Sequence, residues 1–375
     1  MKDTFLSGNT IVVKIGTNLL ADNVKGINRE RIDSIAKSVS SLQSRGKRVA
    51  VVSSGAIGAG IMLLGMKERP KAIPEKQAAA AIGQPILMEA YENAFRKYQR
   101  TIAQILLTKD DFASRPRYIN TKNTFSALFE NNVVPIVNEN DTVAVEEIKL
   151  GDNDNLSALV ANLIEADLLI ILSDVDGLFS DDPSKNPQAE LIPIVDKVTP
   201  HIEKLAKKHG SELGTGGMIT KIQAAKQCIS AGIAVIIANG TRPNILDEIF
   251  SGNFHGTLFL PGQNRLNVRK KWIGFVSDSK GVIVIDPGAK HALLAMQKSL
   301  LPSGVVEVRG EFNREDTISV LDAEGNEIAR GVAGYSASDL NKIKGKRTSE
   351  IQKILNRKSG DEVIHRNNLV LIGVE

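Results

Sequence analysis

Two hydrophobic periodicities alternate along the first 260 residues of the chain. Short runs rich in β-branched residues are typical of buried parallel strands, and longer stretches with apolar residues every three or four positions predict amphipathic helices. The predicted strands cover residues 10–16, 48–53, 101–107, 133–138, 167–173 and 233–238. The predicted helices cover residues 28–46, 76–98, 118–131, 154–165 and 217–231. In the first of these helices, Asn28 is placed to act as N-cap and Gly46 to end the helix.

This alternation of strand and helix predicts an α/β fold, with a mostly parallel sheet that carries helices on both faces. In sheets of this kind, ligands bind at the loops that leave the carboxyl ends of the strands. Candidate functional residues are therefore expected just after each apolar run.

The pattern changes after about Pro261. Residues 266–279 are polar, basic and free of periodic apolar positions, which is typical of a linker. Beyond them, short strands separated by turns are predicted near residues 281–286, 305–310, 317–322, 326–331 and 368–375. The sequence therefore predicts a first domain at 1–265 and a small β-rich domain at 280–375.

The composition indicates an ordinary globular protein and says little more about its class. The chain has 375 residues, is 42% hydrophobic and 24% charged, and has a formal net charge of +4. These values are ordinary for a globular protein, and the charge does not favour nucleic acid or a membrane surface as partner. The single cysteine, Cys228, excludes an intrachain disulfide and fits a reducing compartment. Neither a signal peptide nor a membrane span is recognisable, so we expect a cytoplasmic protein.

Two strand exits near the N-terminus carry groups suited to binding anions. In VVKIGTNLL, Lys14 ends a strand just before Gly16, so the backbone can lie against phosphates while the lysine supplies charge. The alternative is a lysine that serves only solubility. In VVSSGAIGAG (51–60), free backbone N–H groups at a helix start could bind an anion, or the glycines could simply allow close packing.

Polar residues also follow two later elements. Asn138, Glu139, Asn140 and Asp141 leave one strand, and Asp152, Asn153 and Asp154 precede a helix. They could be loop and capping residues, because Asp and Asn favour both roles. They could instead recognise an ammonium group and position cations, with Asp154 holding lysines toward a transferring phosphate.

A glycine-rich segment near residue 215 completes the set. In GTGGMITK, the loop runs into a helix with Lys221 in its first turn, and free amides, helix dipole and lysine together favour an anion. LSDVDGL, with Ser173 and Asp174, suits the wall of a nucleotide pocket. The glycine spacing differs from the GxxxxGK[ST] loop, and VVKIGTNLL lacks the GxGxxG fingerprint, so a dinucleotide-binding dehydrogenase is not supported.

Together, KIGTN, SSGA, NEND, GDND, LSDVDGL and GTGGMITK resemble the amino acid kinase family, in particular its members that phosphorylate the side-chain carboxylate of L-glutamate. IDPGAKHAL, SLLPSGV and VIHRNNLVL resemble a PUA domain. The resemblance spans nearly the whole chain and implies a three-layer α/β/α sandwich followed by the PUA domain. Two departures lie in the second domain. The tail reads HRNNLVL where the family pattern leads us to expect HRDNLVL, and Glu315 stands where we expect glycine before the aspartate.

The resemblance also implies roles for individual residues. ATP and Mg²⁺ would be the co-substrate and its ion, without a confident metal ligand from the protein. The implied catalytic residues are Lys14, Lys221, Asp152 and Asp154. The implied glutamate-binding residues are Ser54, Asp141 and Asn153. The implied ATP-binding residues are Lys14, Ser173, Asp174, Thr215, Gly216, Gly217, Met218, Ile219, Thr220 and Lys221.

No general base is required for this reaction, because the γ-carboxylate of glutamate has a pKa near ~4.3 and is already ionised at neutral pH. The implied lysines and Mg²⁺ would neutralise charge on the transferred phosphoryl group. None of the five histidines lies in the motifs, and we expect them to be structural or at the surface.

Several alternatives and partners follow from the same resemblance. The chain could phosphorylate another carboxylate or a carbamate. It could bind RNA through the PUA domain, although we expect its basic patch at 342–347 to be a solvated face. It could also be a regulatory scaffold that has lost activity. The family further implies a homo-oligomer, dimer or tetramer, and feedback inhibition by proline.

Overall fold

The computed structural model describes residues 6–22, 26–66, 68–144, 153–183, 185–208, 217–261, 279–355 and 361–372. The chain forms two compact units, Met1–Arg265 and Leu266–Glu375. The expected linker at 266–279 lies, apart from Ser279, outside the described residues. Among the helices that are described, none has the length and apolar character needed to cross a membrane.

Within the described residues, one eight-stranded sheet with the order β5-β6-β4-β1-β7-β9-β10-β8 forms the centre of the first unit. All neighbouring strands are parallel except β9 and β10, which confirms the predicted mostly parallel sheet. The strands are β1 (Thr10–Ile15), β4 (Arg48–Val52), β5 (Ile102–Leu107), β6 (Val134–Glu139), β7 (Leu168–Ser173), β8 (Ile194–Val195), β9 (Ala234–Asn239) and β10 (Gly256–Phe259). The six longer strands match the six predictions to within a residue or so, whereas the short strands β8 and β10 were not predicted.

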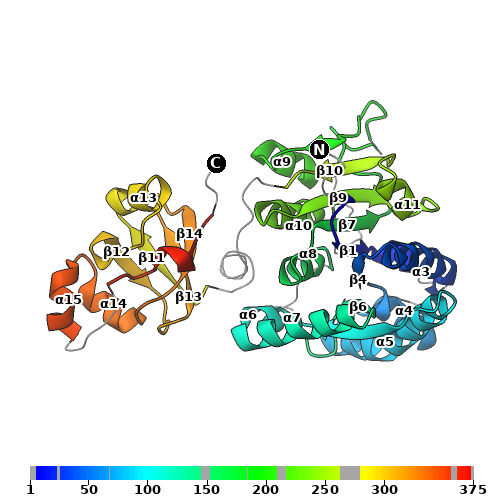
Figure 1. The fold of residues 1–375 in the computed structure, drawn as a ribbon, viewed down its shortest axis with the longest axis horizontal. Coiled ribbons are helices and arrows are strands. Elements are labelled where there is room, and N and C mark those ends of the chain that lie inside the picture. The colour runs from blue at the N-terminus through cyan, green and yellow to red at the C-terminus, as the bar shows by residue number, and fades with distance from the viewer. Residues whose placement is uncertain are drawn as a thin grey trace. The chain divides into compact units, whose positions relative to one another are not determined.

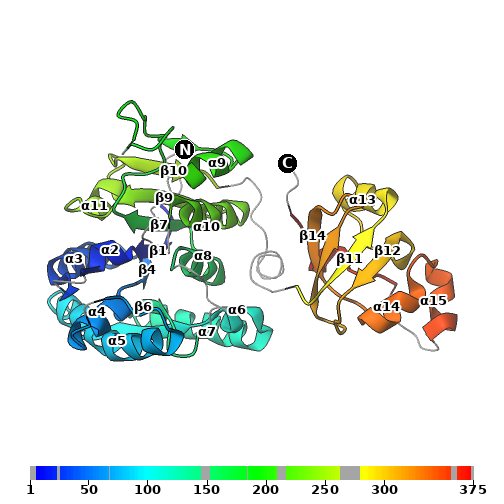
Figure 2. The ribbon, with the colours of Figure 1, turned by 180° about the vertical axis from the view of Figure 1, so that it is seen from behind.

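Helices cover both faces of this sheet (Figures 1 and 2). One layer contains α8 on β1 and β7 and α10 on β9, and the other contains α3 on β4 together with α5 and α11. The helices are α2 (Thr17–Leu20), α3 (Arg29–Ser44), α4 (Ala56–Leu63), α5 (Ile73–Arg96), α6 (Lys109–Ala113), α7 (Arg115–Glu130), α8 (Asn153–Leu163), α9 (Pro200–Lys208), α10 (Met218–Ser230) and α11 (Ile245–Phe250). A small hairpin, β2 (Ala21–Asp22) and β3 (Gly26–Ile27), follows α2.

Local sequence accounts for the bounds of α3. The side chain of Asn28 accepts a hydrogen bond from the backbone N–H of Arg31, which confirms the predicted N-cap. Just after the helix, Gly46 has a φ of +80°, in the left-handed region that glycine adopts at low cost. The helix buries the predicted stripe, which includes Ile32 and Val39, against the strands.

Helices α4 and α5 approach each other unusually closely, and two glycines make this possible. A Cβ built on Gly60 would lie 1.8 Å from the carbonyl oxygen of Ala79, and one on Gly83 would lie 1.8 Å from that of Ala56. No real side chain tolerates such contacts, so both positions require glycine. The close approach sets α5 directly beside the β4–α4 turn.

The second unit contains a five-stranded sheet with the order β12-β11-β13-β14-β15. Its strands are β11 (Gly281–Ile285), β12 (Val305–Arg309), β13 (Thr317–Leu321), β14 (Glu327–Val332) and β15 (Leu369–Leu371). Its helices are α13 (Pro287–Leu294), α14 (Ala337–Ile343) and α15 (Thr348–Leu355), with 3₁₀ turns η2 (Pro302–Gly304) and η3 (Arg366–Asn368). A separate apolar core, which includes Ile283, Val320 and Leu340, fills this unit. The predicted β-rich character is confirmed.

Glu315 adopts a φ of +78°, in the left-handed region, at an exposed position just before β13. An L-residue there costs about 1–2 kcal/mol, and glycine's larger unfolded-state entropy offsets about 0.5–1 kcal/mol of the gain from replacing it. We therefore expect Glu315→Gly to stabilise the chain by about 0.5–1 kcal/mol, measured by calorimetric unfolding. Glu315→Ala is the control, because it removes the same side chain without relieving the backbone. An equal effect of both variants would contradict the backbone explanation.

Candidate active site

The strand register brings several chain exits to one edge of the sheet. Lys14, the fifth residue of β1, lies opposite Val52 of β4 and Ile171 of β7. The loops after β4 and β7 therefore leave the sheet beside the loop after β1. Because these strands are parallel, their polar exits converge, as expected for a ligand site in an open α/β sheet.

Three charged side chains meet at this edge. The Nζ atom of Lys14 lies 2.5 Å from Oδ1 of Asp154, and Nζ of Lys221 lies 3.1 Å from Oδ2. Thr220 also donates from Oγ1 to Oδ2 of Asp154, at 2.8 Å. Lys14 comes from β1, Asp154 from the first turn of α8, and Lys221 from the first turn of α10. Segments far apart in sequence thus supply one ion cluster, which we call the Lys–Asp–Lys triad.

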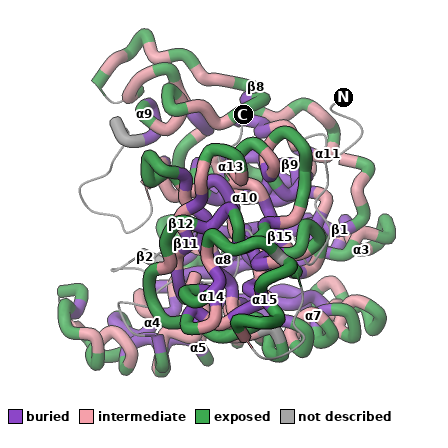
Figure 3. The backbone as a smooth tube through the Cα atoms, turned by 90° about the vertical axis from the view of Figure 1, so that its left-hand side faces the viewer, coloured by how far each residue is buried: buried purple, intermediate pink, exposed green. Residues whose placement is uncertain are grey.

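The triad is buried, and this determines its electrostatic character. Lys14 is 3% exposed, Lys221 is 5% exposed and Asp154 is fully buried. Buried charges must be paired, and here one carboxylate serves two ammonium groups. The triad carries a formal charge of +1, held in a low-dielectric environment at the start of α10. Such a site favours an anion with several negative charges. Nine of the 11 residues of α8 and seven of the 13 residues of α10 are buried, and Figure 3 colours the chain by this burial.

A second polar cluster lies on the α4 side of the site. Nδ2 of Asn153 lies 2.6 Å from the carbonyl oxygen of Ser53, 2.7 Å from Oγ of Ser54 and 3.1 Å from Oδ1 of Asn138, three acceptors that share its two N–H groups. Asn153 immediately precedes Asp154, so the two clusters share the start of α8. The predicted substrate residues Ser54 and Asn153 are therefore in direct contact.

A side-chain hydrogen bond connects the segment after β7 to the segment after β1. Asn18 donates from Nδ2 to Asp174 at 2.9 Å, and Ser173 donates from Oγ to the same carboxylate at 3.0 Å. Partial burial raises the pKa of Asp174, but these hydrogen bonds and the charge of Lys221 outweigh it and hold the pKa below its ordinary value. Asp174 is therefore ionised at neutral pH and contributes negative charge at the rim of the site.

The other predicted site residues are placed unevenly. Gly217 is the N-cap residue of α10, and Met218, Ile219 and Thr220 begin that helix. Asp141 is half-buried in the turn after β6, three residues beyond Asn138. Asp152, Thr215 and Gly216 lie outside the described residues.

Sequence reasoning missed two side chains on α5. Gln84 accepts a hydrogen bond from Nδ2 of Asn138 at 2.9 Å, and the hydroxyl of Tyr91 lies 2.9 Å from Oγ of Ser53. The two are seven residues apart, or two helical turns, so they share a face. Both are buried. A glutamine among the mostly apolar buried residues of this helix is the signal that could have drawn attention to this face.

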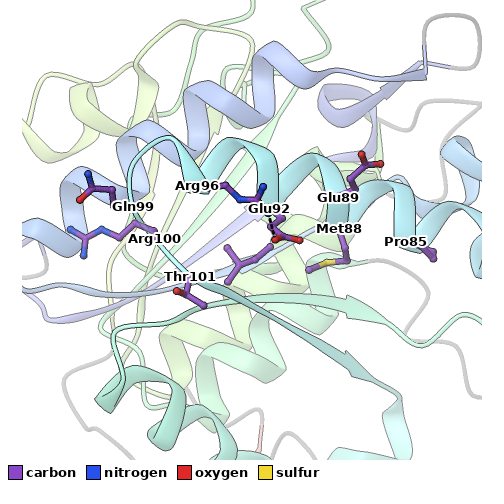
Figure 4. A pocket seen from close by; sticks show the side chains of 9 residues that line it. Pro85, Met88, Glu89, Glu92, Arg96, Gln99, Arg100 and Thr101 are labelled. Atoms are coloured by element: carbon purple, nitrogen blue, oxygen red, sulfur yellow. Dashed lines mark hydrogen bonds and ion pairs between the residues drawn. The ribbon is translucent and has the colours of Figure 1, made fainter.

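A separate surface pocket of about 640 Å³ lies away from these clusters, along the second half of α5 and the start of β5 (Figure 4). Its wall includes an ion pair between Glu92 and Arg96. None of the predicted site residues lines it. The pocket is therefore distinct from the strand exits that hold the triad.

A three-layer α/β/α unit with lysines gathered at its strand exits defines a phosphoryl-transfer class of site, and comparison with known families agrees. The amino acid kinase family model matches residues 9–239, and the PUA domain model matches residues 281–355. The chain belongs to the amino acid kinase family.

Individual relatives narrow the comparison further. The chain is 49% identical to the glutamate 5-kinase of Geobacter sulfurreducens over 362 residues, which cover 96% of this chain and 97% of the relative. It is also 49% identical to the glutamate 5-kinase of Thermoanaerobacter sp. and 50% identical to that of Geobacter metallireducens, with the same coverage. The similarity thus extends across both units.

Proposed function

We propose that the chain is an ATP-dependent kinase that phosphorylates the γ-carboxylate of L-glutamate, giving L-glutamyl 5-phosphate in the first step of proline biosynthesis. The observation that carries this proposal is the 49–50% identity, over 96% of the chain, to relatives named glutamate 5-kinase. The triad supports phosphoryl transfer in general, and the similarity to the relatives indicates that glutamate is the acceptor.

The triad is proposed to act on the transferring phosphoryl group. Lys14 and Lys221 neutralise charge on the β- and γ-phosphates as the bond to the leaving oxygen breaks. Asp154 holds both ammonium groups in place, as its distances of 2.5 and 3.1 Å from them allow. Asp152, two residues before Asp154 in the sequence, is proposed as a further catalytic residue. Because the lysines are already positioned in the folded chain, little reorganisation is needed when the negative charge develops.

Glutamate is proposed to bind on the α4 side, through Ser54, Asp141 and Asn153. Its γ-carboxylate is ionised at neutral pH and attacks the γ-phosphorus without a general base. The new bond joins a carboxylate oxygen to phosphorus, the bond from the γ-phosphorus to the bridging oxygen breaks, and ADP leaves with that oxygen. No proton has to be transferred in this step.

ATP is proposed to enter as its Mg²⁺ complex, with the ion held mainly by phosphate oxygens. Ser173, Asp174 and the segment 215–221 form the nucleotide side, where the start of α10 presents free N–H groups to phosphate. Asp152 and Asp154 can orient water molecules around the ion. These assignments rest on the family resemblance and on the position of α10 and β7 beside the triad.

The remaining proposals concern organisation and regulation. Residues 1–265 form the catalytic domain and 280–375 the PUA domain, in a cytoplasmic homo-oligomer, dimer or tetramer. Feedback inhibition by proline, the end product, is proposed as well, and RNA is not expected as a partner. The oligomeric state and the inhibition by proline rest on the family resemblance. Sedimentation and proline titration of the purified chain test the oligomer and the inhibition.

The reaction is tested by ADP release from Mg-ATP with L-glutamate, N-acetyl-L-glutamate, L-aspartate or no acceptor, with hydroxylamine present to trap an acyl phosphate. We expect turnover and γ-hydroxamate with free L-glutamate alone. Turnover with a different acceptor would support the proposed phosphoryl transfer but contradict glutamate as its substrate. ATP binding without turnover on any acceptor would favour the regulatory scaffold.

Asp141→Ala is expected to raise KM for glutamate by about 10- to 100-fold, because a carboxylate that pairs with the substrate ammonium is worth about 1.5–3 kcal/mol. The KM for ATP and the kcat should change little. Initial rates at varied glutamate measure this, with Asp110→Ala, an exposed carboxylate in α6, as control. An unchanged glutamate KM would place the substrate pocket elsewhere.

A further inference from the structure

The amide side chains of Asn153, Asn138 and Gln84 form a chain of hydrogen bonds beside the β4–α4 turn. Asn153 donates to Ser53 and Ser54 and lies 3.1 Å from Oδ1 of Asn138, whose Nδ2 donates to Oε1 of Gln84 at 2.9 Å. Gln84 belongs to α5, which the Gly60–Gly83 contact holds against this turn. Neither the family motifs nor the proposed mechanism gives Gln84 a role.

The orientation of each amide is determined by neighbours that can only donate or only accept. The carbonyl oxygen of Ser53 only accepts, so Asn153 must present Nδ2 to it rather than Oδ1. The backbone N–H of Glu139 only donates, and it lies 3.0 Å from Oδ1 of Asn138. Asn138 must therefore donate from Nδ2 to Gln84, and Gln84 must accept through Oε1. The orientation that Ser53 requires of Asn153 is compatible with the orientation that Glu139 requires of Asn138.

This orientation leaves a specific atom of Asn153 for the substrate. Its Nδ2 is used by the protein, and within the described part of the chain Oδ1 receives no hydrogen bond. A carbonyl oxygen accepts hydrogen bonds and attracts a positively charged donor. The α-ammonium group of an amino acid is a donor of this kind, whereas an N-acyl group retains only one N–H and no charge.

We propose that Gln84 is a positioning residue for the amino-acid substrate. By accepting from Asn138, it completes the hydrogen bonds of the three amides and so holds Asn153 where its Oδ1 faces the substrate ammonium. Gln84 acts through Asn138 and Asn153. The inference rests on the proposed function, because it assumes that a substrate ammonium binds beside Asn153.

Because Gln84 is buried, the loss of its hydrogen bond to Asn138 should have a measurable effect. Gln84 is 8% exposed and Asn138 is 3% exposed, so water cannot readily replace the Gln84 oxygen. Without that acceptor, Nδ2 of Asn138 loses its partner in a buried position, so Asn138 is held less firmly and Asn153, which contacts its Oδ1, is positioned less precisely. A lost buried partner weakens the state that requires it by about tenfold. The weakening should appear in glutamate binding, since the triad and the nucleotide side do not contact Gln84.

The test compares Gln84→Met with Gln84→Glu by steady-state kinetics on the full chain. Methionine keeps the length and shape of the side chain but has no acceptor suited to Asn138, whereas glutamate keeps the acceptor oxygen. We expect Gln84→Met to raise KM for L-glutamate about tenfold, with kcat and the KM for ATP within about threefold of the original chain. Gln84→Glu should restore the KM for L-glutamate to within about threefold of the original value.

Two further variants make the comparison decisive. Gln84→Asn carries the same amide one methylene too short to reach Asn138, so it replaces Gln84→Met if that variant does not fold. Gln43→Met makes the same chemical change on α3, where the side chain donates to the carbonyl of Asn132 at 3.4 Å. We expect Gln43→Met to leave both KM values unchanged.

An unchanged KM for glutamate in Gln84→Met and Gln84→Asn would overturn the inference, as would an equal rise in Gln84→Met and Gln84→Glu. A fall in kcat with no change in KM would also overturn it, because that pattern indicates a general structural defect. The proposed function fails separately, if the unmodified chain shows no glutamate-dependent ADP release.

Discussion

Lys221→Met is expected to lower kcat for glutamate-dependent ADP release by about two to three orders of magnitude. The substitution keeps an unbranched stem and removes only the ammonium group, which lies 3.1 Å from Asp154 in the triad. Charge spreads over the phosphoryl oxygens in the transition state, so a group aimed at them contributes mainly to kcat. The same reasoning applies to Lys14→Met at the opposite oxygen of Asp154.

Lys226→Met is the matched control for this experiment. Lys226 lies on the same helix, α10, in a largely exposed ion pair with Glu203, and such pairs contribute about 0–1 kcal/mol. We expect it to keep kcat within about twofold. Circular dichroism should show that all three variants are folded. A folded Lys221→Met with nearly normal kcat would remove Lys221 from the mechanism.

The fold could be predicted from the sequence because its signals are local and repeated. The runs that became β1, β7 and β9 are mostly apolar and lie between amphipathic segments, so a buried parallel sheet was the natural interpretation. Strands β8 and β10 escaped prediction because they contain two and four residues, too few for a periodicity to be visible. The antiparallel pairing of β10 with β9 depends on tertiary packing rather than on local sequence.

The site was predictable where its residues lie at strand exits or at the start of a helix, and not where they lie in the middle of a helix. Lys14 and Ser54 follow apolar runs, and a parallel sheet brings such exits together. Gln84 lies within α5, and its importance depends on β6 pairing beside β4, which places Asn138 against that helix. Nothing in the sequence specifies this strand order, because a connection between strands does not reveal which strands become neighbours.

Glu315 is a case in which resemblance and structure point the same way. The family pattern led us to expect glycine there, and the backbone adopts the positive φ that glycine favours. Local sequence alone would not have revealed this, because glutamate rarely occupies that region.

Asp154→Asn is expected to impair both stability and turnover, because one fully buried carboxylate holds two buried lysines. Without it, Lys14 and Lys221 keep two positive charges in a dry environment and lose the carboxylate that lies between them. Breaking a buried ion pair on one side costs about 3–5 kcal/mol. We also expect kcat to fall by at least about 100-fold, since the lysines lose the group that holds them toward the phosphoryl oxygens.

Nucleotide binding distinguishes this role from a general loss of structure. The formal charge of the cluster rises from +1 to +2, so the affinity for ADP, measured by calorimetry, should be retained or increased while kcat falls. Since ligands stabilise the folded state that binds them, saturating ADP should raise the Tm of Asp154→Asn by more than that of the original chain. Lower ADP affinity together with lower kcat would mean that Asp154 shapes the nucleotide pocket itself. Unchanged kcat and Tm would show that the lysines need no anchor.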